Sequence, residues 1–172
     1  NLDIAKDFSQ LEPNNGEKEK HHQRTEVKMY YDDRNIYFGV MMYDNAPDSI
    51  LTELSRRDQG NKNYDEFGIW INPFNDGQIE YNFSVTAAGV QIDRKFSPRS
   101  TDVTWDAVWK SAVKIDDNGW MAEFAIPFSA LRFSNDGKPW AINMGRNIRR
   151  YRELYTWNPI DVEYIEHIAL QA

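Results

Sequence analysis

Two strand-like stretches place one large aromatic side chain among polar groups, a combination that suits a surface for binding sugars. Residues 65–72 and 78–86 alternate between apolar and polar side chains, which predicts that one face of each strand is buried. The opposite face then carries Trp70 beside Glu66 and Asn82. A flat ring can stack on the C–H face of a sugar while carboxylate and amide groups bind its hydroxyls. The alternative is that the N-terminal segment or a loop covers Trp70, which would then have a packing role alone.

Asp106 and Glu123 are the first pair of carboxyl groups to consider for catalysis, because glycosidases hold two such groups ~5 to 9.5 Å apart. A structural explanation is favoured. Arg146 falls on the same face of its strand as Trp140, Ile142 and Met144, so we expect it to turn inward and to pair with Glu123 or Asp106. Such a buried pair would be costly to break. We therefore expect no catalysis from these residues.

Acidic residues and histidines form no specific metal-binding motif. Many of the aspartates stand in or beside turns, where the side chain commonly binds its own backbone. The sequence has no D-x-D-x-D-G loop, so a calcium ion would have to be held by distant loops. His21, His22 and His167 lack the i, i+4 spacing of a helical zinc site. The sequence therefore assigns no metal ligand and no cofactor.

Length and charge limit the class of protein. The 172 residues contain no Pro/Gly/Ser-rich linker and can bury a sizeable core, so we expect one domain over residues 1–172. The net charge of -7 argues against a nucleic-acid partner. No apolar run approaches the ~20 residues that span a bilayer, so we expect no membrane insertion by this segment. Aromatic residues make up 14% of the chain, and part of this excess is expected to face a ligand.

The elements that must position these side chains are short strands joined by turns. The clearest is a hairpin around Asn118-Gly119, a dipeptide that readily supplies the two positive φ angles of a tight turn. Pro127 ends its second strand and predicts a short helical segment after it. Eight or nine strands of this kind, with little helix, predict an all-β fold, an antiparallel β-sandwich with short helical segments.

Four motifs give the chain a family resemblance. They are W-D-x-V-W from Trp105, D-x-G-W-x-x-E-x-x-I-P-F-x-x-L-R-F from Asp117, Y-D-E-F-G-I-W-I-N-P-F-N-D from Tyr64, and N-M-G-R-N-I-R-R-Y-R-E from Asn143. Together they closely resemble the family 9 carbohydrate-binding module-like domains found at the start of large bacterial cell-envelope proteins. The resemblance covers nearly the whole chain and implies a jelly-roll-like sandwich. Relatives usually have a further strand and a D-G-x-L-D-E-x-W segment before this point, so we expect a piece of a larger protein that lacks the first family strand.

The resemblance also implies a second aromatic contact for a sugar. Trp157 lies in a late loop and resembles one of the two tryptophans that sandwich the sugar in binding members of the family. Most other residues of the family's sugar site are not present at the matching positions of this sequence. The family's sugar-contacting Glu falls on Gly68, the Arg of the following strand on Ser84, and the Asn before the late Trp on Leu154. Near the position of the family's second sugar-stacking Trp, this sequence has only Tyr64 as an aromatic residue.

We therefore expect a non-catalytic module that binds a poly- or oligosaccharide. The expected contacts are stacking by Trp157 and Trp70 and hydrogen bonds from Glu66, Asn82, Tyr64 and Arg94. The resemblance further implies a bacterial cell-envelope or secreted location, attachment to further domains and, as in some members, a structural calcium ion; we expect the domain itself to be monomeric. Two alternatives stay open: a structural or docking domain that has lost the sugar site, which the substituted positions favour, and a glycoside hydrolase domain.

Overall fold

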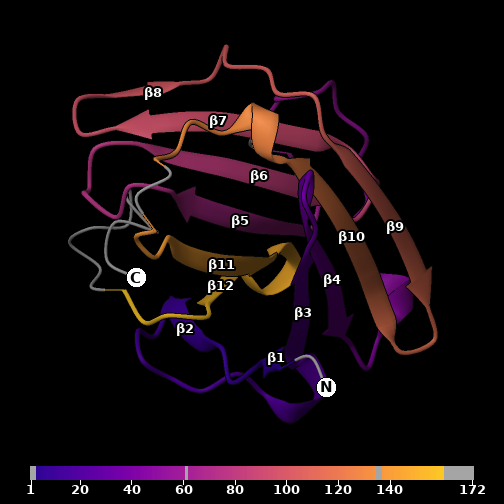
Figure 1. Cartoon of the computed structure of the whole chain (residues 1–172). Helices are drawn as coiled ribbons and strands as arrows, with labels where there is room; N and C mark the ends of the chain where they lie inside the picture. Colours follow the sequence, from indigo (N-terminus) through magenta and orange to yellow (C-terminus); the bar gives the residue numbers. More distant parts are fainter. Residues whose placement is uncertain (1–2, 61, 135–136, 161–172) are drawn as a thin grey trace.

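The computed structural model describes residues 3–60, 62–134 and 137–160 and shows two antiparallel sheets packed face to face (Figure 1). Residues from both sheets share one apolar core, in which the rings of Phe67 and Phe124 have centroids 6.1 Å apart. No helix within these ranges is long and apolar enough to cross a membrane. The predicted all-β, antiparallel sandwich is confirmed.

Sheet A has five strands in the order β1-β3-β4-β10-β9. Their bounds are Ile4–Ala5 (β1), Thr25–Tyr31 (β3), Asn35–Tyr43 (β4), Lys110–Asp116 (β9) and Gly119–Pro127 (β10). Apolar side chains point into the core at every second position of β4 and β10, and they include Phe38 and Phe124, which are buried. The residues between them form the outer face of this sheet.

Sheet B has seven strands in the order β2-β12-β11-β5-β6-β7-β8. Their bounds are Ser9–Glu12 (β2), Glu66–Asn72 (β5), Glu80–Thr86 (β6), Gln91–Ser97 (β7), Ser100–Asp102 (β8), Ala141–Ile148 (β11) and Glu153–Thr156 (β12). Four single-turn helices complete the fold: His21–Gln23 (η1), Pro47–Ser49 (η2), Phe128–Ala130 (η3) and Arg149–Tyr151 (η4). The helix η3 directly follows Pro127, as predicted.

The β9–β10 hairpin forms where it is predicted, but its turn differs. Asp116 pairs with Gly119, so the two loop residues are Asp117 and Asn118. Neither of these has a positive φ, whereas Gly119 has a φ of 140°. A Cβ at Gly119 would overlap the backbone carbonyl oxygen of Met42. The glycine is therefore required by the close approach of β4 rather than by the centre of the turn.

The aromatic residues of the hairpin motif fill the core. Trp109 stacks on Phe124 with ring centroids 5.6 Å apart and meets Phe83 edge-on at 5.5 Å. Trp105 also packs edge-on against Phe83, and Trp120 is fully buried. Much of the aromatic excess, part of which was expected to face a ligand, is thus explained by packing between the sheets.

Arg146 is the buried charge that joins the two sheets. It projects inward from β11 of sheet B and is 0% exposed. Its Nη1 donates to the carbonyl oxygen of Gln23 at 2.6 Å, and its Nη2 donates to that of Tyr43 at 3.0 Å. Gln23 lies just before β3, and Tyr43 ends β4. One side chain of sheet B therefore binds backbone groups at two places on the other side of the core, in η1 next to β3 and at the end of β4.

The predicted pairing of Arg146 with Glu123 or Asp106 is wrong. Ala122 and Phe124 face the core, so the alternation of β10 turns Glu123 outward, where it is exposed. Asp106 instead pairs with Arg57 at 3.0 Å, and its side chain is 72% exposed. The two terminal nitrogens of the guanidinium donate to carbonyl groups instead of a carboxylate partner.

Buried acids lie close to Arg146 and affect its charge. Burial lowers the pKa of Arg146 to about 10, while Asp65, Asp44 and Glu19 act in the opposite direction. Burial also raises the pKa of Asp65 to about 6. It raises that of Glu19 to about 7, although Glu19 accepts hydrogen bonds from two backbone N–H groups. Burial therefore disfavours the charged form of both acids relative to water.

Replacing Arg146 by Met should lower the free energy of unfolding by ~3 to 5 kcal/mol, because buried carbonyl groups lose their donors and the nearby acids lose their cation. Denaturant unfolding followed by circular dichroism measures the change. Glu123→Gln is the matched control, since an exposed residue on the outer face should leave the midpoint unchanged. An equal loss in both variants would mean that Glu123 and Arg146 interact after all.

The Asp65 carboxyl group should make stability fall as pH rises from about 4 to about 6. An acid whose pKa is higher in the folded chain keeps a proton there that the unfolded chain releases, so unfolding becomes easier across that window. Asp65→Asn removes this titration and should gain up to about 3 kcal/mol on the wild type between pH 4 and pH 7. Urea unfolding of both proteins at several pH values tests this; a constant difference would contradict it.

Candidate functional site

The outer face of sheet B brings together most of the residues predicted from strand alternation. Trp70 pairs with Asn82 of β6, and Asn82 pairs with Arg94 of β7. Glu66 lies on the same face of β5, and Tyr64 precedes that strand. Burial raises the pKa of Tyr64, Glu66 raises it further, and Arg94 acts in the opposite direction.

Trp70 lies against the sheet instead of standing free of it. A Cβ at Gly68 would lie 2.8 Å from the Trp70 ring, and one at Gly145 would lie 3.2 Å from it. The ring also packs against a small cluster formed by Leu11 and Ile160. The expectation that the N-terminal segment covers Trp70 therefore describes the structure better than an open stacking platform. It also explains Gly68, because the ring occupies the space of a side chain there.

The polar groups beside Trp70 are satisfied within the protein. Asn82 is 0% exposed, and its Nδ2 donates to the Ile69 carbonyl oxygen and to Ser84 Oγ. The hydroxyl of buried Tyr64 donates to the Gln59 carbonyl oxygen at 3.2 Å. Burial raises the pKa of Glu66, against a hydrogen bond from Ser84 and the positive charge of Arg94. This cluster is built as an internal polar network, and a binding role for its members stays a prediction.

Trp157 lies on the opposite side of sheet B from Trp70. It borders an apolar pocket of about 200 Å³ at the edge of the sandwich, with Met144, Val27 and Phe38, which point inward, among the lining residues. Its backbone N–H donates to the Met144 carbonyl oxygen at 2.9 Å. The two tryptophans therefore do not face each other, and they cannot stack on the two sides of one sugar ring.

The acidic residues that the sequence singles out do not form an obvious catalytic or metal centre. Arg57 binds both Asp106 and the fully buried Asp93, so Asp106 belongs to an ion-pair cluster. Glu123 points out of the other sheet. Within residues 3–60, 62–134 and 137–160, no three His, Asp or Glu side chains gather closely enough to hold a metal ion. His167 lies outside these residues.

A groove crosses the outer face of sheet A, a surface that the sequence reasoning overlooked. It consists of two adjoining hollows, of about 440 Å³ and about 420 Å³, which share Gly39 and Glu123. The outward-facing residues that line the hollows are Tyr37, Gly39, Lys110, Ala112, Glu123, Ala125, Glu26, Lys28, Met41 and Met121. We call this surface the groove.

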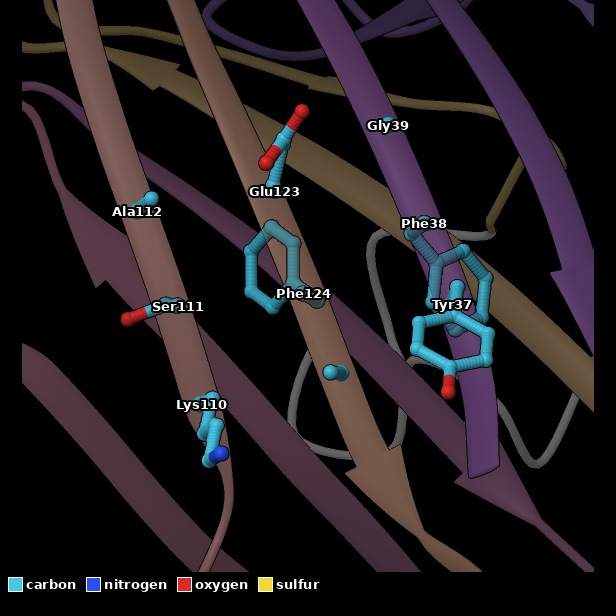
Figure 2. Close-up of a pocket in the computed structure, with 9 residues that line it drawn as sticks. Tyr37, Phe38, Gly39, Lys110, Ser111, Ala112, Glu123 and Phe124 are labelled. Atoms are coloured by element: carbon cyan, nitrogen blue, oxygen red, sulfur yellow. The ribbon is translucent and has the colours of Figure 1, made fainter. Parts of the chain in front are cut away.

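The register of sheet A forms the floor of the groove. Glu123 of β10 lies between Gly39 of β4 and Ala112 of β9, and Figure 2 shows these three residues at one level along neighbouring strands. Two of them have no side chain longer than a methyl group, so the carboxylate of Glu123 rises from a low surface. It forms no hydrogen bond or ion pair with the part of the chain that the structure describes.

Tyr37 forms a fixed aromatic wall on one side of this floor. Its hydroxyl donates to Asp32 at 2.9 Å and accepts from the Asn35 side chain at 2.9 Å. Its ring stacks on Tyr30 of β3, with centroids 6.0 Å apart and planes 28° apart. The bond to Asp32 raises the pKa of the Tyr37 hydroxyl, so the ring stays neutral and held in place.

The opposite wall of the groove is formed by methionines. Met41 of β4 pairs with Met121 of β10, and each lies two residues along its strand from Gly39 or Glu123. Their side chains are flexible and apolar, and they can adapt to the shape of a ligand. The groove therefore combines a rigid aromatic side, an adaptable apolar side and a free carboxylate between them.

Comparison with known proteins gives one family and a set of similar folds. The model of the carbohydrate family 9 binding domain-like family matches residues 5–151. A family 9 carbohydrate-binding module from Caldicellulosiruptor kristjanssonii, in complex with cellotriose, superposes with a TM-score of 0.63 at 15% identity over 97% of this chain and 77% of that chain. A protein from Bacteroides uniformis ATCC 8492 gives 0.69 at 15% identity over 92% and 78%. No curated protein sequence matches the chain.

Two glycine variants test whether the outer face of sheet B is filled by Trp70 while the outer face of sheet A is open. Gly68→Ala should destabilise the fold by ~1 to 3 kcal/mol, because the new methyl group would overlap the Trp70 ring and Ser84 Oγ. Gly39→Ala, at the floor of the groove, has no atom within 4 Å of the added Cβ and should be neutral. Denaturant midpoints of the two variants, with tryptophan fluorescence, measure this. A stable Gly68→Ala variant would mean that Trp70 can move away freely.

Proposed function

The chain belongs to the carbohydrate family 9 binding domain-like family, and from this we propose that it binds an oligo- or polysaccharide without hydrolysing it. We place the binding site in the groove on the outer face of sheet A. The observation that carries this assignment is the position of Glu123, an exposed carboxylate with no partner in the described ranges, beside the fixed ring of Tyr37.

The groove supplies both kinds of contact that a sugar needs. The Tyr37 ring and the methionine pair offer apolar surface for the C–H groups of a pyranose. The carboxylate of Glu123 can accept hydrogen bonds from hydroxyl groups, and bonds to a charged acceptor are the stronger kind. Glu123 has no hydrogen bond within the described residues to give up when it binds a ligand. Little of the binding energy is therefore lost to rearrangement.

The other candidate surfaces meet these needs less well. The polar groups around Trp70 are already bound to one another, and a ligand would have to break those bonds. The pocket at Trp157 is lined chiefly by apolar side chains, which leaves sugar hydroxyls without partners. The groove is the surface where an aromatic ring and an unengaged carboxylate occur together.

Hydrolysis is not favoured by the acids of the groove. Glycosidases use two carboxyl groups on either side of the bond that is cleaved. The second carboxylate that lines the groove, Glu26, interacts with Arg24 at 3.3 Å and with the Tyr43 hydroxyl at 3.4 Å. One free carboxylate suits binding of hydroxyl groups more than catalysis.

The biological setting is also part of the proposal. The motifs shared with domains of bacterial cell-envelope proteins support a location in the cell envelope or outside the cell, with the domain attached to others. There the domain would hold its protein on a saccharide. Detecting the full-length protein in cell fractions would test this part separately.

Calorimetric titration with cellotriose, preceded by a glycan array to widen the choice of ligand, tests the proposed function. Tyr37→Ala and Glu123→Gln should each weaken binding by ~1 to 3 kcal/mol, through lost stacking and a lost charged acceptor. Tyr31→Ala is the matched control, because Tyr31 is 70% exposed and lies outside the groove.

Two results would contradict the assignment in different ways. Normal binding by the Tyr37 and Glu123 variants, with loss in Trp157→Ala, would move the site to the pocket at the sandwich edge. No binding of any glycan by the folded wild type would leave a docking or structural role as the better explanation.

A further inference from the structure

We propose that two copies of this chain pair through β9, so that their sheets A join into one continuous antiparallel sheet across a two-fold axis. The inference does not depend on the saccharide-binding function proposed above. Three features of β9 carry it: its place at an open edge, the direction of its backbone groups and the order of its charges.

The strand β9 forms one edge of sheet A and is open to solvent. It is last in the strand order and, within the described ranges, pairs with β10 alone (Figure 1). None of the seven residues of β9 is buried, whereas its neighbour β10 buries every inward-facing side chain. A long strand at the edge of a sheet is a template for a further strand.

The hairpin shows which backbone groups of β9 face the open side. Opposite residues of an antiparallel pair alternate between those that exchange two hydrogen bonds and those that exchange none. Asp116 and Gly119 close the two-residue loop, and the closing pair of such a loop exchanges hydrogen bonds. Every second residue of β9, counted from Asp116, therefore bonds to β10. The residues between them direct their N–H and C=O groups to the open side, and they are Ser111, Val113 and Ile115.

A contact at the start of β9 supports this direction and limits the open stretch. Trp109 belongs to the same series, and its carbonyl oxygen accepts a hydrogen bond from Gln91 Nε2 of sheet B at 3.3 Å, on the side away from β10. The backbone groups of Ser111, Val113 and Ile115 on that side have no hydrogen-bond partner within the described ranges. Three N–H and three C=O groups are thus available to a second strand.

The backbone groups of β9 match those of a second copy about Val113. Two copies related by a two-fold axis present the same surface to each other and pair antiparallel. With the axis beside Val113, Ser111 lies opposite Ile115 of the second copy, and the two Val113 residues lie opposite each other. All three open residues then pair with open residues. The pairing also covers part of Ile115, an apolar side chain that is 40% exposed.

The charges of β9 favour the same register. With the axis beside Val113, Lys110 lies opposite Asp116 of the second copy, and the symmetry repeats this pair. Moving the axis by one residue would place Lys114 opposite itself, or Lys110 opposite Lys114 of the second copy. Like charges directly opposite each other are destabilising, and opposite charges are stabilising. The edge strand is therefore complementary to itself, which favours a second copy as its partner.

This dimer differs from the monomer expected from the sequence, because a sequence does not show which strand lies at the edge of a sheet. One pair of short strands is a small interface, at the low end of specific contacts. We expect a dissociation constant of about 10 to 100 µM.

Sedimentation velocity from about 1 µM to about 1 mM protein tests the proposal and should show a reversible dimer. Lys110→Asp and Asp116→Lys should each weaken the dimer at least about tenfold, since each places like charges opposite each other twice. An equal mixture of the two variants should form the dimer again, because each copy then meets the opposite charge. Lys18→Asp is the matched control, because exposed Lys18 lies beside Ser9 of sheet B and should have no effect.

Val113→Pro tests the backbone pairing separately from the charges. Proline removes the N–H at the centre of the proposed interface and is tolerated on an edge strand where that group faces solvent. The dimer should weaken at least about tenfold, while circular dichroism shows that the sandwich is retained.

The mixing experiment decides between the outcomes. Two single variants that are monomeric alone and form a dimer together would support the proposal. A wild type that stays monomeric over the whole range would overturn it. A dimer that persists in Lys110→Asp, or one that the mixture does not restore, would also overturn it, because its interface would lie elsewhere or in another register.

Discussion

The buried guanidinium of Arg146 is the interaction on which the arrangement of the two sheets depends. A cation removed from water must be compensated inside the protein, and here carbonyl oxygens of Gln23 and Tyr43 provide most of that compensation. The acids near it contribute further, at the cost of pKa values raised by burial. The guanidinium is thus compensated without any carboxylate of β10, and Glu123 faces outward with the alternation of its own strand.

The strands and the core were predictable because they depend on local alternation, whereas the partner of Arg146 was not. The alternation of Trp120 and Phe124 with Glu123 already places this carboxylate on the outer face of β10. The expected ion pair with Arg146 contradicted that pattern. It arose because a sequence shows carboxylates as partners for a buried cation but does not show backbone carbonyl groups, which every residue carries. Side-chain parity was the better guide of the two.

The groove could not be predicted in the same way, because its parts come together only through strand register. Gly39 and Ala112 carry no signal in their own strands, and Glu123 was considered only as a catalytic acid or as a partner of Arg146. Their alignment at one level follows from pairings between β4, β10 and β9. A shift of either pairing by two residues would bring a larger side chain beside Glu123 and fill the floor. The outward parity of Tyr37 was readable from the sequence, but the space in front of it was not.

Two glycines show how the outer faces of the sandwich came to differ. At Gly68 the space of the absent side chain is filled by the protein's own Trp70, which packs against Leu11 and Ile160. At Gly39 the corresponding space is empty, since no atom lies within 4 Å of where a Cβ would stand. A glycine on a sheet face can thus serve internal packing or keep a surface hollow. Only the second leaves room for a ligand, which is why the aromatic ring of Tyr37 carries more weight for binding than that of Trp70.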